Sequence, residues 1–217
     1  MLHEIFHFFG RAICHQLEER SLLVSGGPLA VCARDTGIYI GVFSTFIYLH
    51  FTKRSQSITI PSIKLSFLLL LMLVPLILDG LGSYSNLFES NNLRRLVTGI
   101  SFGLVLPYFI YPLLSKRSLL HGSKSVISNR MDFLAPLLVS VLIGGLFYLG
   151  QPSHYVLDSF ITFSIIGWFS LIASFLFQFI QSERIKSVLS ITASLTFLTF
   201  LSFAHKWILY LSSISIE

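Results

Sequence analysis

Charged residues are scarce in this sequence. Only 12% of its 217 residues are Asp, Glu, Lys or Arg, whereas soluble domains carry about a quarter. The hydrophobic share is 53% and the mean hydropathy is +0.77. The charges are clustered, and the uncharged runs between them approach the length of about 20 residues that a helix needs to cross a bilayer. The composition therefore excludes a soluble domain and predicts an all-α, polytopic helical membrane protein.

Several recognisable signals are also missing. The first residues lack the basic leader, the apolar core and the small-residue cleavage site of a secretory signal, and carry His3, Glu4, His7 and Arg11 instead. There is no glycine-rich phosphate loop and no nucleic-acid module, so we expect no nucleic-acid partner. No serine has a histidine and an acid in a recognisable order, which leaves a serine hydrolase unsupported. The expected partner is the lipid bilayer.

Six apolar runs are expected to form transmembrane helices. They cover residues 37–52, 65–81, 96–114, 133–150, 156–180 and 187–204. The last run could continue to about residue 213, because Trp207 and Tyr210 are typical of a membrane interface. We expect one integral membrane domain over 1–217, with an amphipathic helix and a cysteine segment in 1–35 and a bundle of about six helices in 36–213.

The basic residues predict the orientation. Nine of the 15 Lys and Arg residues fall in three expected connections, 53–64, 115–131 and 181–187. The positive-inside rule places these connections in the cytoplasm, beneath the cell (inner) membrane. The polar segments 14–36 and 79–99 then share the extracytoplasmic face, where they could form one site.

Residues 2–18 are expected to form an amphipathic helix that ends near Arg20. At 100° per residue, seven polar side chains fall within one arc of roughly 120°: His3, Glu4, His7, Arg11, Cys14, His15 and Glu18. The pattern fits a helix lying in the membrane interface, and also a helix lining a water-filled cavity. Ser25 to Pro28 should form a turn after it. Gly37 and Gly41 would let another backbone approach the first span closely.

The only two cysteines stand in two short polar motifs, Cys14-His15 and Cys32-x-x-Asp35. Cys, His and Asp are all zinc ligands, so the four residues could form a tetrahedral metal site. Adjacent Cys14 and His15 project about 100° apart on a regular helix, which makes joint chelation difficult. Two other interpretations remain open: a disulfide on an oxidising face, or ordinary packing in which Asp35 caps the first span.

A second polar segment, 79–99, carries ionisable residues at the end of an apolar span. Asp79 has natural partners in Arg34 or Arg95, because ionisable groups at membrane depth usually pair or line a pathway. Four residues are candidates for binding an anionic group: Arg34, Asn92, Arg95 and Thr98. The candidate catalytic residues are His15, Arg34, Asp79, Asn92 and Arg95. Alternatively, these side chains only cap and join helices. His154 and Asp158, at i and i+4, could join the same site.

Both polar segments resemble the motifs of a known family, the bacterial and archaeal membrane proteins catalogued as domain of unknown function 2085. The matching residues are Cys14-His15-Gln16, Glu19-Arg20-Ser21, Cys32-Ala33-Arg34, Thr36-Gly37-Ile38-Tyr39, Gly41, Asp79-Gly80, Glu89-Ser90, Asn92, Arg95 and Thr98-Gly99. The family typically reads Cys-Ala-Arg-Cys-Thr-Gly, which implies a Cys-His-Cys-Cys site. Asp35 replaces the last cysteine here, and a thiolate-rich site is less expected for that reason. Ser83 and Phe88 also depart from the family pattern, at positions where Gln and Arg are usual.

The resemblance implies no activity, so the function is inferred from the residues. We expect an outward-facing pocket in which Cys14, His15, Cys32 and Asp35 hold a divalent metal such as zinc. Together with the basic residues, this predicts a metal-dependent enzyme acting on a lipid-linked or other membrane-borne substrate with an anionic group. A small transporter or permease and a non-catalytic assembly or structural protein remain the alternatives.

Overall fold

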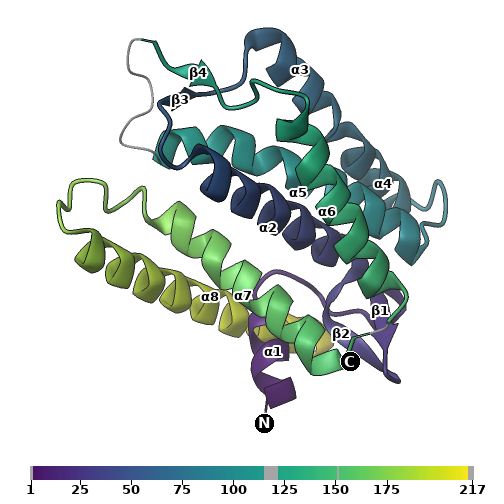
Figure 1. Ribbon diagram of the computed structural model, residues 1–217. Coiled ribbons are helices and arrows are strands. Elements are labelled where there is room, and N and C mark those ends of the chain that lie inside the picture. Colours follow the sequence, from purple (N-terminus) through teal and green to yellow (C-terminus); the bar gives the residue numbers. More distant parts are fainter. Residues whose placement is uncertain (1, 115–121, 151, 215–217) are drawn as a thin grey trace. The chain divides into compact units, whose positions relative to one another are not determined.

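The computed structural model describes residues 2–114, 122–150 and 152–214, and side-chain surroundings up to residue 211. Residues 115–121 of the expected connection 115–131 lie outside the described residues. The chain divides into two compact units, Met1–Cys32 with Pro152–Glu217, and Ala33–Gln151. Most described residues are helical, which confirms the expected class (Figure 1).

The first unit combines the N-terminal segment with the last two long helices. Its elements are α1 (Leu2–Arg11), a 3-10 turn (Glu18–Arg20), β1 (Ser21–Val24), β2 (Gly27–Cys32), α7 (His154–Ala173) and α8 (Glu183–Ile214). Helices α7 and α8 lie side by side, and α1 contacts both of them (Figure 1). Strand β2 contacts α1 and α7, so the cysteine segment is anchored on helices from both ends of the chain.

The second unit is built around α2 and α5. Its elements are α2 (Ala33–Lys53), β3 (Ile58–Thr59), α3 (Ile63–Leu71), α4 (Val74–Tyr84), α5 (Asn92–Leu114), β4 (Lys124–Ser125) and α6 (Met131–Tyr148). Helix α2 packs against α5 and α6. Strands β3 and β4 pair in parallel and join the connection after α2 to the one after α5. Two of the expected basic connections therefore meet at one end of this unit.

Five helices in the described part of the chain are long and apolar enough to cross a membrane. They are Ile63–Tyr84, Asn92–Leu114, Met131–Tyr148, His154–Ala173 and Glu183–Leu211. Helix α2 covers the expected span 37–52 but is not among them, so the count of six is not confirmed. Its Ser, Thr, Tyr and His residues lower its hydropathy, and about half of its residues are buried within the protein.

The expected span 65–81 is interrupted. Helix α3 ends at Leu71 and α4 begins at Val74, with Pro75 in its first turn. Proline has no N–H and its ring clashes with the carbonyl four residues earlier, so it interrupts a helix but suits the start of one. The expected span 156–180 is also shorter than predicted, because α7 ends at Ala173.

Helices α2 and α5 approach each other through glycines. A Cβ atom added at Gly37 would lie 2.2 Å from the carbonyl oxygen of Leu96, and one at Gly99 would lie 2.1 Å from that of Arg34. A Cβ atom added at Gly41 would lie 2.6 Å from the backbone nitrogen of Leu104 in α5. The expected close approach at Gly37 and Gly41 is confirmed, and it brings the first turn of α2 beside the first turns of α5.

The expected helix over residues 2–18 is wrong in its length, since α1 ends at Arg11 rather than near Arg20. Gln16 excludes a regular helix through the rest of the expected range, because its backbone adopts φ 55°, which no right-handed helix accommodates. Its side-chain amide donates hydrogen bonds to the carbonyl oxygens of His7 and Ala30, both at 2.8 Å. Gln16 thus ties α1 to β2.

The expected turn at residues 25–28 is confirmed, and it belongs to a β-hairpin that the sequence pattern did not indicate. Val24 pairs with Gly27, so Ser25 and Gly26 form a two-residue loop. Both loop residues have positive φ, 49° and 85°, as the type I′ hairpin turn requires. The hairpin returns the chain from β1 to β2 and delivers Cys32 at the end of the second strand.

Candidate functional site

Cys14 and Cys32 lie together in the first unit. Cys14 is buried, and its Sγ accepts a hydrogen bond from the backbone N–H of Cys32 at 3.2 Å. The two cysteines are not bonded as a disulfide. Cys14 is held on the turn after α1, where its own N–H donates to the carbonyl of Gly10 at 2.9 Å. Backbone hydrogen bonds therefore hold both cysteines in place.

Asp35 adds a carboxylate to this pair. It follows Cys32 by three residues and stands in the first turn of α2. One ligand atom from each of Cys14, Cys32 and Asp35 lies within 4.8 Å of the others, close enough to share one metal ion. Three of the four expected ligands are therefore brought together.

His15 is placed differently from its expected role. It is exposed, and its ring packs edge-on against the ring of His205 with 4.8 Å between centroids. His15 is not among the residues whose ligand atoms lie within 4.8 Å of one another, which are Cys14, Cys32 and Asp35. Cys14 and His15 are adjacent in the irregular segment after α1, where Cys14 is buried and His15 is exposed.

His154 and Asp158 support the strand that ends at Cys32. The Asp158 carboxylate is fully buried and accepts a hydrogen bond from the backbone N–H of Ala30 at 2.9 Å. The Nε2 atom of His154 lies 2.9 Å from the carbonyl oxygen of Pro28, and its Nδ1 lies 3.0 Å from Asp158. The pair therefore anchors β2 on α7.

A group of histidines surrounds this anchor. The ring of His3 lies 4.1 Å from that of His7 and 5.6 Å from that of His154, measured between centroids. The Nε2 atom of His7 is buried and has no hydrogen-bond partner among the described residues. Burial, and next the positive charge of His3, lower the pKa of His7 from its ordinary value. His7 is thus held in its neutral form near neutral pH.

In the second unit, Asp79 is the centre of a buried ion-pair cluster. Arg34 donates to its Oδ2 atom, and the hydroxyl of Ser90 donates to Oδ1 at 2.6 Å. Arg94 lies 3.0 Å from Oδ1 and stacks over the Phe88 ring at 4.2 Å. The expected pairing of Asp79 with Arg34 is confirmed. Two arginines meet one carboxylate, which leaves an excess of positive charge.

The other expected anion-binding residues are engaged within α5. Arg95 is nearly buried and donates to the side-chain oxygen of Asn92 at 3.1 Å. The Thr98 hydroxyl donates back to the carbonyl of Arg94 at 2.9 Å. Arg94, whose side chain is 46% exposed, is the arginine of this helix that reaches Asp79. Arg94, rather than the expected alternative Arg95, is therefore the second arginine that pairs with Asp79.

A second buried ion pair was also overlooked. Lys53 and Asp132 lie 2.9 Å apart, with both side chains only 5% exposed. The carboxylate also accepts hydrogen bonds from the backbone N–H groups of Ser128 and Asn129, at 2.8 and 2.9 Å. The only sequence signal was an acid at the start of an apolar span. The sequence did not indicate Lys53 as the partner of Asp132, because Lys53 belongs to another helix and lies 79 residues away.

Comparison with known proteins gives one family. Residues 14–109 match the family described as predicted membrane protein, DUF2085. An uncharacterised protein of Methanocaldococcus jannaschii is 37% identical over 101 residues, which is 46% of this chain and 63% of that relative. An uncharacterised protein of Methanothermobacter thermautotrophicus is 35% identical over 96 residues, 44% of this chain and 82% of the relative. No solved structure matches. The matched region contains both the cysteine motifs and the Asp79 cluster.

Proposed function

Given that this chain belongs to the DUF2085 family of predicted membrane proteins, we propose that it is a metal-dependent membrane enzyme. Its metal ligands are Cys14, Cys32 and Asp35. The observation that supports this proposal is the spacing of their ligand atoms, all within 4.8 Å of one another. Two thiolates and a carboxylate suit zinc, which accepts sulfur and oxygen ligands alike.

The number of ligands indicates the chemistry. Structural zinc sites use four protein ligands, whereas catalytic sites use three and keep one position for water or substrate. A metal in an open site activates its bound water and polarises a substrate oxygen. We therefore expect metal-assisted hydrolysis or group transfer. His15 is not expected to bind the metal directly.

The substrate is expected to be membrane-borne and to carry an anionic group. Arg34 directly precedes Asp35 in the first turn of α2, so one arginine of the Asp79 cluster is adjacent in sequence to a proposed metal ligand. That cluster has two arginines for one carboxylate, and Arg94 is half-exposed. Arginine forks bind phosphate and carboxylate groups, and this supports a phosphorylated or carboxylated lipid-linked substrate.

Elemental analysis of the purified full chain tests the proposal. We expect about one metal ion per chain in the unmodified protein, since one three-ligand site is proposed. Cys14→Ser and Asp35→Ala should both lose the metal. Glu19→Gln, which alters an exposed acid on the neighbouring 3-10 turn, should retain it. Metal-free protein whose mass shows a Cys14–Cys32 disulfide would overturn the proposal.

A further inference from the structure

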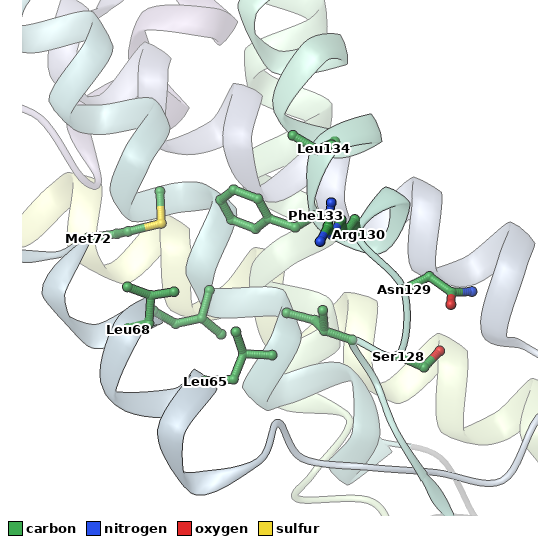
Figure 2. A pocket seen from close by; sticks show the side chains of 10 residues that line it. Leu65, Leu68, Met72, Ser128, Asn129, Arg130, Phe133 and Leu134 are labelled. Atoms are coloured by element: carbon green, nitrogen blue, oxygen red, sulfur yellow. The ribbon is translucent and has the colours of Figure 1, made fainter.

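The second unit contains an apolar pocket far along the chain from the cysteine motifs. The pocket has a volume of about 390 Å³, within the range of sites that hold small molecules. The pocket is lined on one side by residues of α3 and the residue that follows it, Leu65, Leu68, Leu69 and Met72. On the other side it is lined by Phe133 and Leu134 of α6. Figure 2 shows Leu65, Leu68 and Met72 on one helix, with Phe133 and Leu134 on another.

The pocket has a firm floor and an open rim. Leu69 is fully buried in the core cluster that includes Tyr108, and Met72 and Phe133 pack against that cluster. At the rim, Leu68 is 59% exposed and Leu134 is 42% exposed. Both lining helices belong to candidate membrane spans, so we expect the exposed leucine rim to open to the hydrocarbon of the bilayer. The floor is therefore preformed, and the mouth is expected to face acyl chains.

One edge of the pocket is polar and basic. It is formed by Ser128, Asn129 and Arg130, immediately before α6. Arg130 is exposed and forms no ion pair within the described part of the chain. The nearest acid along the chain, Asp132, is already paired with Lys53. The positive charge of Arg130 is therefore available to a ligand.

Hydrogen bonds fix this edge in place. The Asp132 carboxylate accepts the backbone N–H groups of Ser128 and Asn129, which closes the turn before α6. The turn is thus held by a buried group, and Arg130 is presented from a rigid segment. Rigid presentation of a cation lowers the entropy cost of binding an anion there.

We propose that this pocket binds an anionic phospholipid of the surrounding bilayer. One acyl chain lies among the leucines and Phe133, and the phosphate pairs with Arg130. Basic pockets between transmembrane helices bind anionic lipid headgroups in this manner. A soluble anion would gain nothing from the apolar wall, and a lipid without net negative charge would gain less from the arginine. The site is independent of the proposed metal centre.

Native mass spectrometry of the full chain, titrated with phosphatidylglycerol in detergent micelles, tests the charge. Arg130→Gln should weaken binding of the first lipid at least about tenfold, since a hydrogen bond to a charged group contributes at least about the 1.4 kcal/mol that a tenfold change requires. Lys124→Gln removes an exposed cation from the same connection that does not line the pocket, and it should leave binding unchanged. Equal losses in both variants would show a diffuse surface charge and overturn the proposal. Equal affinity for phosphatidylcholine, which has no net charge, would also overturn the proposal.

A second pair of variants tests the pocket itself. Leu68→Trp places a larger side chain at the pocket wall and should abolish the high-affinity phosphatidylglycerol peak. Leu138→Trp, on an exposed α6 position that does not line the pocket, is its control and should bind like the unmodified chain. Thermal unfolding shows whether each variant is folded. Unchanged binding in folded Leu68→Trp would mean that the lipid lies elsewhere, and would overturn the proposal.

Discussion

The backbone N–H of Cys32 donates a hydrogen bond to Sγ of Cys14 at 3.2 Å, across 18 residues of sequence. This contact sets the end of β2 against the turn after α1, and Asp35 follows three residues later. Such backbone contacts orient a ligand before a metal arrives, which reduces the ordering cost of binding. The proposed centre is therefore built from the early end of α1 and from the hairpin.

Asp79→Asn should strongly destabilise the second unit. The substitution removes the charge that neutralises Arg34 and Arg94, and it leaves Arg34 partly buried without an anion. Removing one partner of a buried ion pair costs about 3–5 kcal/mol. Unfolding of the purified protein in detergent measures the loss. Glu89→Gln, an exposed acid in the same segment, is the control. A similar small effect in both variants would contradict the buried cluster.

Gly37→Ala should separate α2 from α5. The new methyl group would lie 2.2 Å from a backbone oxygen, which cannot move without shifting the helix. Overpacking of this kind costs about 1–3 kcal/mol. Gly145→Ala is a matched control on α6, where an added Cβ meets no atom within 4 Å. It should be neutral or stabilising by up to about 1 kcal/mol, because alanine favours helix. Comparable unfolding temperatures in the two variants would be inconsistent with glycine-mediated packing.

Gln16→Glu should loosen α1 and β2 together. The carboxylate cannot donate to the carbonyl oxygens of His7 and Ala30, and it would repel both. We expect a local loss of about 1–2 kcal/mol, seen as faster hydrogen exchange of amides in both elements. Gln56→Glu removes a similar side-chain bond, to the carbonyl of Thr52, at an exposed site. If exchange in α1 and β2 is the same in both variants, Gln16 does not hold them together.

His7 should make the first unit less stable in acid. Its pKa is lowered in the folded chain, chiefly by burial and then by His3, so the unfolded chain binds the extra proton more readily. The stabilisation is complete above about pH 6.5 and is lost as the pH falls from there toward the lowered pKa. The unfolding temperature of His7→Gln should depend less on pH in this window than that of the unmodified chain. An unchanged pH dependence would exclude His7 as the titrating group.

The parts of the structure that depend on local chemistry could be predicted from sequence. Long apolar runs predicted most helices, because a bilayer demands that length and composition. The paired glycines predicted close packing of α2, and Asp79 predicted an arginine partner. Serine, glycine and proline at 25–28 predicted the turn.

The parts that depend on tertiary contacts could not be predicted. Gln16 joins the segment after α1 to β2 through a bond to Ala30, which is 14 residues away and has no sequence pattern of its own. Lys53 and Asp132 pair across 79 residues. Whether Arg94 or Arg95 reaches Asp79 depends on the rotation of α5 about its axis, and that rotation is set by glycine contacts with α2. His15 lies outside the ligand group and packs against His205, which is far away in the sequence.

The absorption spectrum of the purified chain loaded with Co²⁺ tests the metal centre most directly, because thiolate ligands give cobalt a charge-transfer band that other ligands do not. A site with Cys14, Cys32 and Asp35 as ligands predicts this band in the unmodified chain and in His15→Ala. The band should weaken in Cys14→Ser and in Cys32→Ser. A Co²⁺-loaded chain without the band, or a band unaffected by both cysteine substitutions, would contradict the proposed centre.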